Sequence, residues 1–205
     1  MTATLKKSEY EILNLFRKNI FLSSTIRAIS LTLKKPYPNT YNIITELVRK
    51  KILKIEKVGQ SSVCKLNLVK ESISYLSFMD NQEAFSMKIQ NIDKILEFKE
   101  FFDDIILITG SYAKSIQTKQ SDIDLVIIAK DKDEAFKKDK LLSNLTDLMK
   151  PEIHQIVITQ KDFINMLTEK GASFGKEIFF NRILFRNSER YYELIKEAIN
   201  NGFRI

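Results

Sequence analysis

Two segments decide the fold of the C-terminal half of this 205-residue chain: Gly110-Ser111-Tyr112-Ala113-Lys114 and Ser121-Asp122-Ile123-Asp124-Leu125. Apolar residues precede the first segment and follow the second, which predicts buried strands over 105–109 and 121–129. Asp122 and Asp124 are two apart on the second strand, so their side chains leave the same face. Adjacent carboxylates repel each other unless a cation joins them, and Mg²⁺ prefers oxygen ligands. This pattern therefore predicts a Mg²⁺ site at Asp122 and Asp124.

Gly110 and Ser111 come directly after the first predicted strand and begin a predicted helix. A backbone without a Cβ, a hydroxyl group and the N–H groups at the start of a helix all suit phosphate oxygens. We therefore expect Gly110 and Ser111 to bind the phosphates of a nucleotide.

These residues resemble the nucleotidyltransferase superfamily of DNA polymerase beta, in particular its minimal members. The shared pattern is Gly-Ser, a spacer and Asp-x-Asp, and the resemblance covers roughly residues 100–160. It implies two-metal transfer of a nucleoside monophosphate from an NTP. Asp122 and Asp124 would then hold Mg²⁺, and Gly110 and Ser111 would hold the triphosphate. Many members carry a second glycine four residues after the serine, where this chain has Ser115.

The family also places a third carboxylate on a neighbouring strand. The corresponding predicted strand, 153–159, is preceded by Glu152 and contains His154, which share one face by alternation. Both are candidate catalytic residues. Imidazole is a poor ligand for Mg²⁺ but a reasonable general base. The alternatives are a solvated Glu152 at the strand edge and a His154 ring held by a backbone hydrogen bond.

Basic residues are concentrated in the first third of the chain. Residues 1–70 hold 14 Lys and Arg against 4 Asp and Glu, residues 71–205 hold 19 against 22, and the net charge is +7. The first seventy residues predict three helices and then a hairpin over 52–68 with a turn at Gly59. This order resembles a winged helix-turn-helix domain over about residues 5–70.

The resemblance implies DNA binding by the third predicted helix, which Pro38 and Asn39 open. A helix fits the major groove, and the side chains of its first turn face the base edges. We expect one group to contact bases: Asn39, Thr40 and Asn42. A second group suits phosphates: Lys34, Lys35 and, in the wing, Lys57. The alternative is a winged helix that contacts only protein.

Further local patterns complete the prediction. Ser8 and Glu11 have capping-box spacing, Ser23 or Ser24 can cap the second helix, and Cys64 is predicted to be a small buried residue. Residues 71–102 predict a linking helix, which serves either packing or dimerisation. Its apolar stripe comprises Phe85, Ile89, Ile92 and Leu96. Helices are also predicted over 133–149, 160–168, 176–185 and 188–200. The expected fold class is α+β, with domains at 1–70, 71–102 and 103–205.

Composition excludes several classes of protein. Cys64 is the only cysteine and His154 the only histidine, which excludes a disulfide framework, cysteine-rich zinc sites and metal motifs with two histidines. No apolar run is long enough to span a membrane, and residues 1–7 carry no signal-like apolar region. We therefore expect a cytoplasmic protein without a membrane partner.

Three functional hypotheses follow. The first is a DNA-binding enzyme that transfers a nucleoside monophosphate to an unidentified acceptor, which is a protein or a tRNA in some relatives. The second is a transcriptional regulator whose transferase domain is inactive or senses a ligand. The third is an antitoxin-type minimal nucleotidyltransferase. Because winged helices often bind DNA as dimers, a homodimer is a further expectation.

Overall fold

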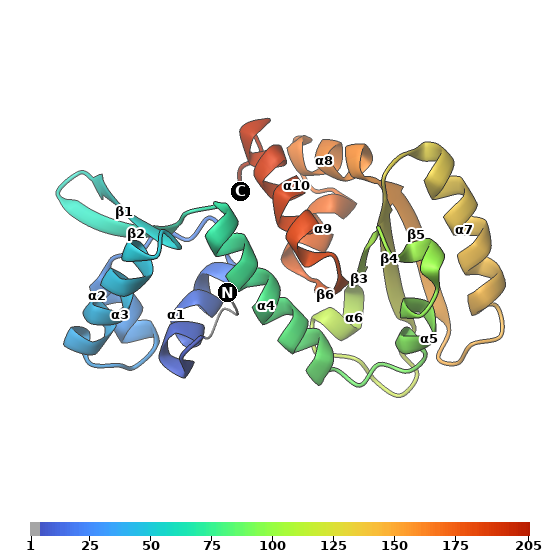
Figure 1. Cartoon of the computed structure of the whole chain (residues 1–205), viewed down its shortest axis with the longest axis horizontal. Helices are drawn as coiled ribbons and strands as arrows, with labels where there is room; N and C mark the ends of the chain where they lie inside the picture. Colours follow the sequence, from blue (N-terminus) through green and yellow to red (C-terminus); the bar gives the residue numbers. More distant parts are fainter. Residues whose placement is uncertain (1–4) are drawn as a thin grey trace. The chain divides into compact units, whose positions relative to one another are not determined.

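The computed structural model describes residues 5–205. It contains helices and two separate small sheets, which confirms the α+β class (Figure 1). Contacts divide the chain into two units, the first reaching to Met79 and the second running from Asp80 to Arg204. Each unit contains one of the sheets. Within the described residues, no helix combines the length and the apolar character that a membrane crossing requires.

The first unit has the predicted order of three helices and a hairpin. Its elements are α1 (Lys7–Lys18), α2 (Ile26–Thr32), α3 (Tyr37–Arg49), β1 (Leu53–Val58) and β2 (Ser61–Leu66). Apolar residues of the helices form the core, among them Ile12, Leu13, Phe16, Ile29, Ile44 and Leu47. The strands are antiparallel, with Val58 opposite Ser61. The two-residue turn begins at Gly59, whose φ of +59° suits a residue without a Cβ.

Both predicted helix caps are wrong in detail. The Glu9 carboxylate, and not that of Glu11, accepts a hydrogen bond from the N–H of Lys6 at the start of α1. Glu11 instead forms an ion pair with Lys35. Thr25 caps α2, since its hydroxyl accepts from the N–H of Ala28 at 3.2 Å. Glu11 contacts a distant segment instead of the helix start, and spacing along the chain does not encode such a contact.

Ser24 pairs with the hairpin instead of capping a helix. Its N–H donates to the carbonyl of Cys64 at 3.2 Å, and the N–H of Cys64 donates back at 2.7 Å. This bridge ties β2 to the segment before α2. Cys64 is fully buried, as predicted, and burial raises the pKa of its thiol to about 11.

The predicted linking helix is interrupted. α4 (Lys70–Ser86) ends before Ile89, and α5 (Ile92–Leu96) follows Asn91, whose φ is +64°. A short 3-10 helix covers Lys99–Phe101. The single apolar stripe was therefore a wrong prediction, because its four residues do not share one helix. Phe85 is 95% exposed, whereas Ile89 and Ile92 are buried.

The second unit is built on a four-stranded sheet in the order β5-β4-β3-β6. Its strands are β3 (Ile105–Ile108), β4 (Ile123–Ala129), β5 (Ile153–Thr159) and β6 (Ile183–Arg186). β3 runs antiparallel to β4 and β6, and β4 runs parallel to β5. The short helix α6 (Gly110–Ala113) links β3 to β4, and α7 (Lys132–Thr146) links the parallel pair.

Helices cover both faces of this sheet (Figure 1). On one face, Leu125 and Ile127 pack with Ile92 and Ile95 of α5 and with Leu142 of α7. The opposite face carries α8 (Gln160–Thr168), α9 (Phe174–Phe180) and α10 (Ser188–Asn200). Because side chains alternate along a strand, Asp124, Val126 and Ile128 point toward this second group of helices.

The predicted helix over 176–185 is only half correct. α9 ends at Phe180, and Ile183 to Arg186 form β6, the edge strand beside β3. Ile183 and Leu184 are buried as expected, but in a strand, whereas Phe180 is 53% exposed. Apolar residues run through the whole segment without a Gly or Pro to separate helix from strand, so periodicity alone could not find the boundary.

Candidate functional site

His154 brings the two predicted metal-binding aspartates together. The register of the parallel pair sets Asp124 of β4 directly beside His154 of β5. The imidazole Nε2 lies 3.7 Å from Oδ2 of Asp122, and Nδ1 lies 3.9 Å from Oδ1 of Asp124. Asp122 itself stands one residue before β4 begins. Both carboxylates thus lie on the same side of the sheet, against a single ring.

Glu152 joins the same group. Its Oε1 lies 3.6 Å from Nε2 of His154, so the imidazole faces three carboxylates. The His154 side chain is 54% exposed, and within the described part of the chain no backbone hydrogen bond holds the ring. The alternative of a ring held by a backbone hydrogen bond is therefore not seen in this part of the chain, and the role of His154 as a general base stays a prediction.

Gly110 allows Asp124 to approach the start of α6. A Cβ on residue 110 would stand 1.9 Å from Oδ2 of Asp124, and the φ of Gly110 is +65°. The N–H of Thr109 also donates to the carbonyl of Asp124 at 2.9 Å, which fixes the two strands at this point. Only glycine fits here without moving the carboxylate.

Ser111 lies within the short helix α6, and Ser115 follows its end. Ser111 is half-buried, and its carbonyl accepts the N–H of Ile116 at 3.0 Å. Ser115 has a φ of +56°, a left-handed conformation that glycine adopts at lower cost. Ser115 occupies this conformation at the position where the sequence resemblance leads one to expect a glycine.

Two charged residues near Asp124 were not predicted. The ammonium of Lys114 binds Oε1 of Glu177, on α9, at 2.8 Å. Burial raises the pKa of the Asp124 carboxyl, and the charges of Asp122 and Glu177 add to that rise while His154 and Lys114 oppose it. Lys114 follows Gly110-Ser111 closely and was detectable from the motif. Glu177 lies far away in sequence and carries no motif.

The carboxylate oxygens of Asp122 and Asp124 are the candidate ligands for Mg²⁺. Asp122 and Asp124 supply oxygen ligands on one face, half exposed and without a Lys or Arg ion pair in the described residues. No cluster of three or more His, Cys, Asp and Glu among residues 5–205 is arranged to hold a metal by itself. The two carboxylates therefore fit a Mg²⁺ ion that takes its other ligands from phosphate and water, and His154 does not fit as a ligand.

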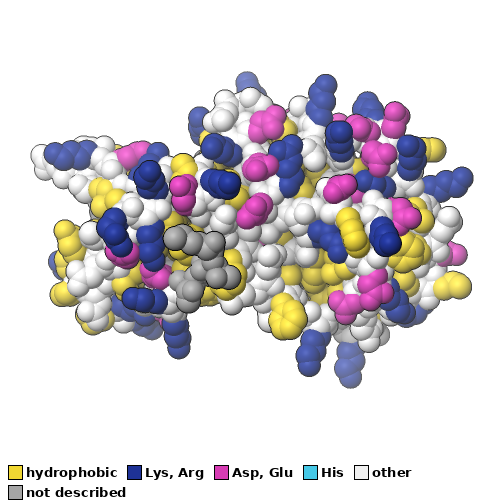
Figure 2. Space-filling model, viewed as in Figure 1, with side chains coloured by type: hydrophobic (Ala, Val, Ile, Leu, Met, Phe, Trp, Pro, Cys, Tyr) yellow, Lys and Arg dark blue, Asp and Glu magenta, His cyan; other side chains and the backbone are white. Residues whose placement is uncertain are grey.

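The predicted DNA-contact residues of the first unit lie mostly on its surface. Lys34, Asn39, Asn42 and Lys57 are exposed, and Lys35 is half-buried beside Glu11. Asn39, Asn42 and Lys35 help to line a hollow of about 400 Å³. Figure 2 shows Lys and Arg side chains spread over this unit with fewer acidic ones among them.

Thr40 is the exception, and its predicted contact with bases is wrong. Its side chain is fully buried, and its hydroxyl donates to the carbonyl of Pro36 at 3.1 Å. Besides Asn39 and Asn42, Tyr37 and Tyr41 also face outward on α3; both are about half exposed, with ring centroids 6.1 Å apart. Their spacing of four residues on an amphipathic helix was the signal that could have found them.

Comparison with known proteins locates a nucleotidyltransferase domain in the second unit. The model of the nucleotidyltransferase domain family matches residues 89–185, which include every site residue from Gly110 to Glu177. A search of curated protein sequences finds no match.

Two solved structures are distantly similar, each at 16% identity. One is MepR, a transcription regulator of the Staphylococcus aureus multidrug efflux pump MepA, with a TM-score of 0.31 over 45% of this chain and 73% of that chain. The other is a toxin-antitoxin with AMP-PNP, with a TM-score of 0.35 over 54% of this chain and 86% of that chain.

Proposed function

We propose that this chain transfers a nucleoside monophosphate from an NTP to an acceptor hydroxyl group with the help of Mg²⁺, and that residues 1–70 bind DNA. One observation supports the transfer most directly. Asp122 and Asp124 stand against one imidazole, with Gly110 packed against Asp124, inside the matched nucleotidyltransferase domain.

The roles of the residues follow from their chemistry. Asp122 and Asp124 hold Mg²⁺, and Gly110 and Ser111 bind the triphosphate through backbone N–H groups and the serine hydroxyl. When bound, Mg²⁺ neutralises charge at the transferred phosphorus and favours the ionised acceptor. Lys114, four residues after Gly110 in the chain, is a further candidate to meet phosphate oxygens.

His154 takes the proton in this proposal. The acceptor oxygen forms a bond to the α-phosphorus, the bond from that phosphorus to pyrophosphate breaks, and pyrophosphate leaves. The proton of the hydroxyl passes to the imidazole of His154, and the nearby carboxylate of Glu152 stabilises the imidazolium that results.

Transfer of label is the direct test. The full chain is incubated with NTPs labelled at the α-phosphate, with Mg²⁺ and with an extract that contains protein and tRNA. We expect label on a macromolecule with the wild type and none with Asp122→Asn or Asp124→Asn. Asp147→Asn is the matched control, because Asp147 is exposed at the end of α7, outside the site. An intact chain that binds no NTP in the presence of Mg²⁺ refutes the proposal.

DNA binding is tested separately. We expect the affinity of the full chain for duplex DNA to fall steeply with salt, and the slope to decrease in Lys34→Ala and Lys57→Ala. Lys99→Ala, in the second unit, is the control and should leave the slope unchanged. If the wild type has no affinity for DNA at low salt, the first unit binds something else.

A second candidate function rests on the third catalytic position. The resemblance implies a third carboxylate, for which Glu152 and His154 are the candidates, and a second glycine where this chain has Ser115. These two departures from the family pattern favour a DNA-binding regulator with an inactive transferase domain. Its signature is DNA binding that survives Asp122→Asn and Asp124→Asn, together with no transfer of label to any acceptor.

A further inference from the structure

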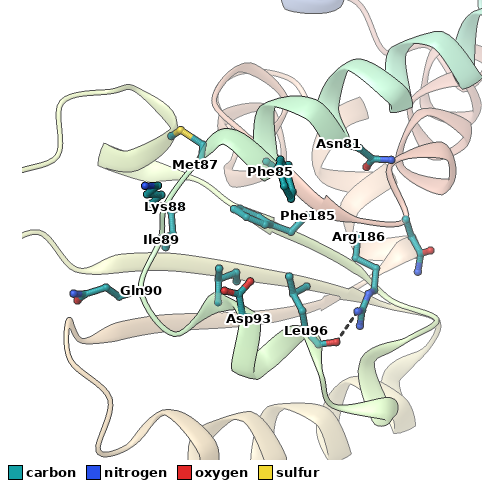
Figure 3. Close-up of a pocket in the computed structure, with 13 residues that line it drawn as sticks. Asn81, Phe85, Met87, Lys88, Ile89, Gln90, Asp93, Leu96, Phe185 and Arg186 are labelled. Atoms are coloured by element: carbon teal, nitrogen blue, oxygen red, sulfur yellow. Dashed lines mark hydrogen bonds between the residues drawn. The ribbon is translucent and has the colours of Figure 1, made fainter. Parts of the chain in front are cut away.

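A pocket of about 740 Å³ lies in the second unit, between the end of α4, the segment 87–91, α5 and β6 (Figure 3). Its wall is largely apolar and contains Phe85, Met87, Ile89, Leu96 and Phe185. This volume is within the range of about 300–1,000 Å³ that small-molecule sites occupy. Phe85 is 95% exposed there, although a large aromatic side chain gains free energy when it is covered.

The pocket is separate from the nucleotide site. Ile89 and Ile92 line it and pack in the same core as Ile123 and Leu125. Asp124 points to the opposite face of the sheet because side chains alternate along β4. The sheet itself therefore stands between the pocket and the aspartate pair, and neither the family match nor the proposed transfer assigns the pocket a ligand.

A β-bulge in β6 directs two neighbouring side chains into the pocket. Leu184 pairs with Leu107 and Arg186 pairs with Ile106, so Phe185 is the extra residue on β6. Ile106 belongs to the pocket side of the core, and its partner Arg186 shares that side. Phe185 and Arg186 consequently both line the pocket, which a regular strand would not allow.

Arg186 supplies an unused hydrogen-bond donor. Its Nη2 donates to the carbonyl of Leu96 at 2.6 Å, drawn as a dashed line in Figure 3, and its guanidinium lies 4.7 Å from the ring centre of Phe102. Its Nη1 is shielded from solvent and has no hydrogen-bond partner among the described residues. Burial lowers the pKa of Arg186, and the negative charge of Asp104 opposes that shift.

We propose that this pocket binds a small organic anion with a flat apolar body. The carboxylate or sulfonate group meets the guanidinium of Arg186, and the apolar body lies against Phe85 and Phe185. Because Nη1 is shielded from solvent, the anion reaches it only when the surrounding side chains move, and it then supplies the acceptor that this donor lacks. Two exposed charged residues that line the pocket change its affinity for the anion: Lys88 attracts the anion and Asp93 repels it.

Two fluorescent probes with the same kind of aromatic body separate charge from apolar contact. Anilinonaphthalene sulfonate carries the anion, and phenylnaphthylamine is its neutral counterpart. We expect the full chain to bind one equivalent of the sulfonate at least tenfold more tightly than the neutral probe. Equal affinity for the two probes overturns the proposal, because Arg186 would then play no part.

Substitutions of residues that line the pocket test whether the two probes bind there. We expect Arg186→Gln to weaken the sulfonate about tenfold and to leave the neutral probe within about twofold, since only the sulfonate loses a charge-assisted hydrogen bond. Phe85→Ser should weaken both probes. Phe136→Ser is the matched control, because Phe136 is 77% exposed on α7 and does not line the pocket. Unchanged binding in folded Arg186→Gln and Phe85→Ser contradicts the assignment.

Substitutions at the rim give a test that does not depend on the stability of Arg186→Gln. Lys88 and Asp93 are both exposed, so their variants should fold like the wild type by circular dichroism. We expect Lys88→Gln to weaken the sulfonate and Asp93→Asn to strengthen it, each by about twofold to fivefold at low salt, with no effect on the neutral probe. No change, or a change in the opposite direction, refutes the proposal.

Discussion

Asp104 and Asp124 lie in the same unit, and their negative charges are compensated in opposite ways. Asp104 is 2% exposed, and the ammonium of Lys138 lies 2.8 Å from each of its carboxylate oxygens. Burial raises the pKa of Asp104, and its bond to Lys138 opposes that rise. Asp124 is 36% exposed on its side chain, and no Lys or Arg pairs with it among the described residues; its neighbour is the imidazole of His154, with Nδ1 at 3.9 Å.

The difference in pairing assigns Asp104 to the stability of the fold and leaves Asp124 as a candidate for function. A buried carboxylate without a cation is strongly destabilising, so the fold provides Lys138 for Asp104. Asp124 has two like charges nearby, Asp122 and Glu177, and both raise its pKa. Burial contributes most to that rise, and Glu177 is itself paired with Lys114 at 2.8 Å. Asp122 and Asp124 lack such a partner in the described residues, and in the function proposed above a bound Mg²⁺ would supply the compensating charge.

The largest effect is expected for Asp124→Asn. Transfer of label from NTP should fall about a thousandfold or more, which corresponds to about 4 kcal/mol in the activation barrier. The melting temperature should stay the same or rise, because one of three neighbouring carboxylates loses its charge. A variant that loses both activity and stability would remove the contrast with Asp104.

Lys138→Met should show the reverse pattern. It leaves Asp104 buried without its cation and should lower the free energy of unfolding by about 3–5 kcal/mol, measured by denaturant titration. The remaining folded protein should transfer label at the wild-type rate. The double variant Lys138→Met/Asp104→Leu should recover much of the loss, and if it does not, the ion pair is not the cause.

A smaller effect on stability is expected for Tyr192→Phe. The Tyr192 hydroxyl donates to Oδ2 of Asp80 at 2.6 Å, and both residues are buried. Loss of this bond should cost about 1–3 kcal/mol in thermal or denaturant unfolding. Tyr191→Phe is the matched control, since the buried hydroxyl of Tyr191 has no partner in the described chain and its removal should be neutral or stabilising.

Ser115→Gly tests whether the site stores backbone strain. Ser115 adopts a φ of +56°, so glycine should stabilise the protein by about 0.5–1 kcal/mol. Ala135→Gly, in the helical backbone of α7, should cost about 1 kcal/mol instead. The melting temperature should therefore rise in Ser115→Gly and fall in Ala135→Gly if the backbone at Ser115 is strained. A destabilising Ser115→Gly would mean that the serine side chain makes a contribution that exceeds the strain.

The smallest effect concerns an exposed carboxylate of the wing. Glu56 binds Lys54 at 2.6 Å and Lys65 at 2.7 Å, and these two ion pairs lower the pKa of Glu56 to about 2. A lowered pKa contributes stability above the unfolded value near 4.5 that is lost as the pH falls toward 2. The melting temperatures of wild type and Glu56→Gln should therefore differ slightly at pH 7 and converge near pH 2.

The parts of the fold that the sequence predicted are those with a local signal. Short apolar runs identified β3, β4 and β5, and the spacing of Asp122 and Asp124 placed both carboxylates on one side of the sheet. The hairpin was found from its glycine turn. In each case the residues that decide the structure are close together in the chain.

The errors have a common physical cause. β6 exists because β3 offers an unpaired edge, and Thr40 is buried because α3 turns it toward the core of its own unit. The ion pair of Lys114 with Glu177 joins α6 to α9. These outcomes depend on contacts between distant segments, and periodicity in one segment does not report them.

The buried thiol of Cys64, on β2, allows local opening of the first unit to be measured by thiol labelling. Cys64 carries the only thiol in the chain, it is fully buried, and its backbone makes the bridge to Ser24. Because the thiol is fully buried, a thiol reagent can reach it only when the structure around Cys64 opens. The rate of labelling, divided by the rate for the unfolded chain, therefore measures how often that part of the first unit opens. One equivalent of reagent thus reports local opening in the unit proposed to touch DNA, and DNA itself should slow that labelling.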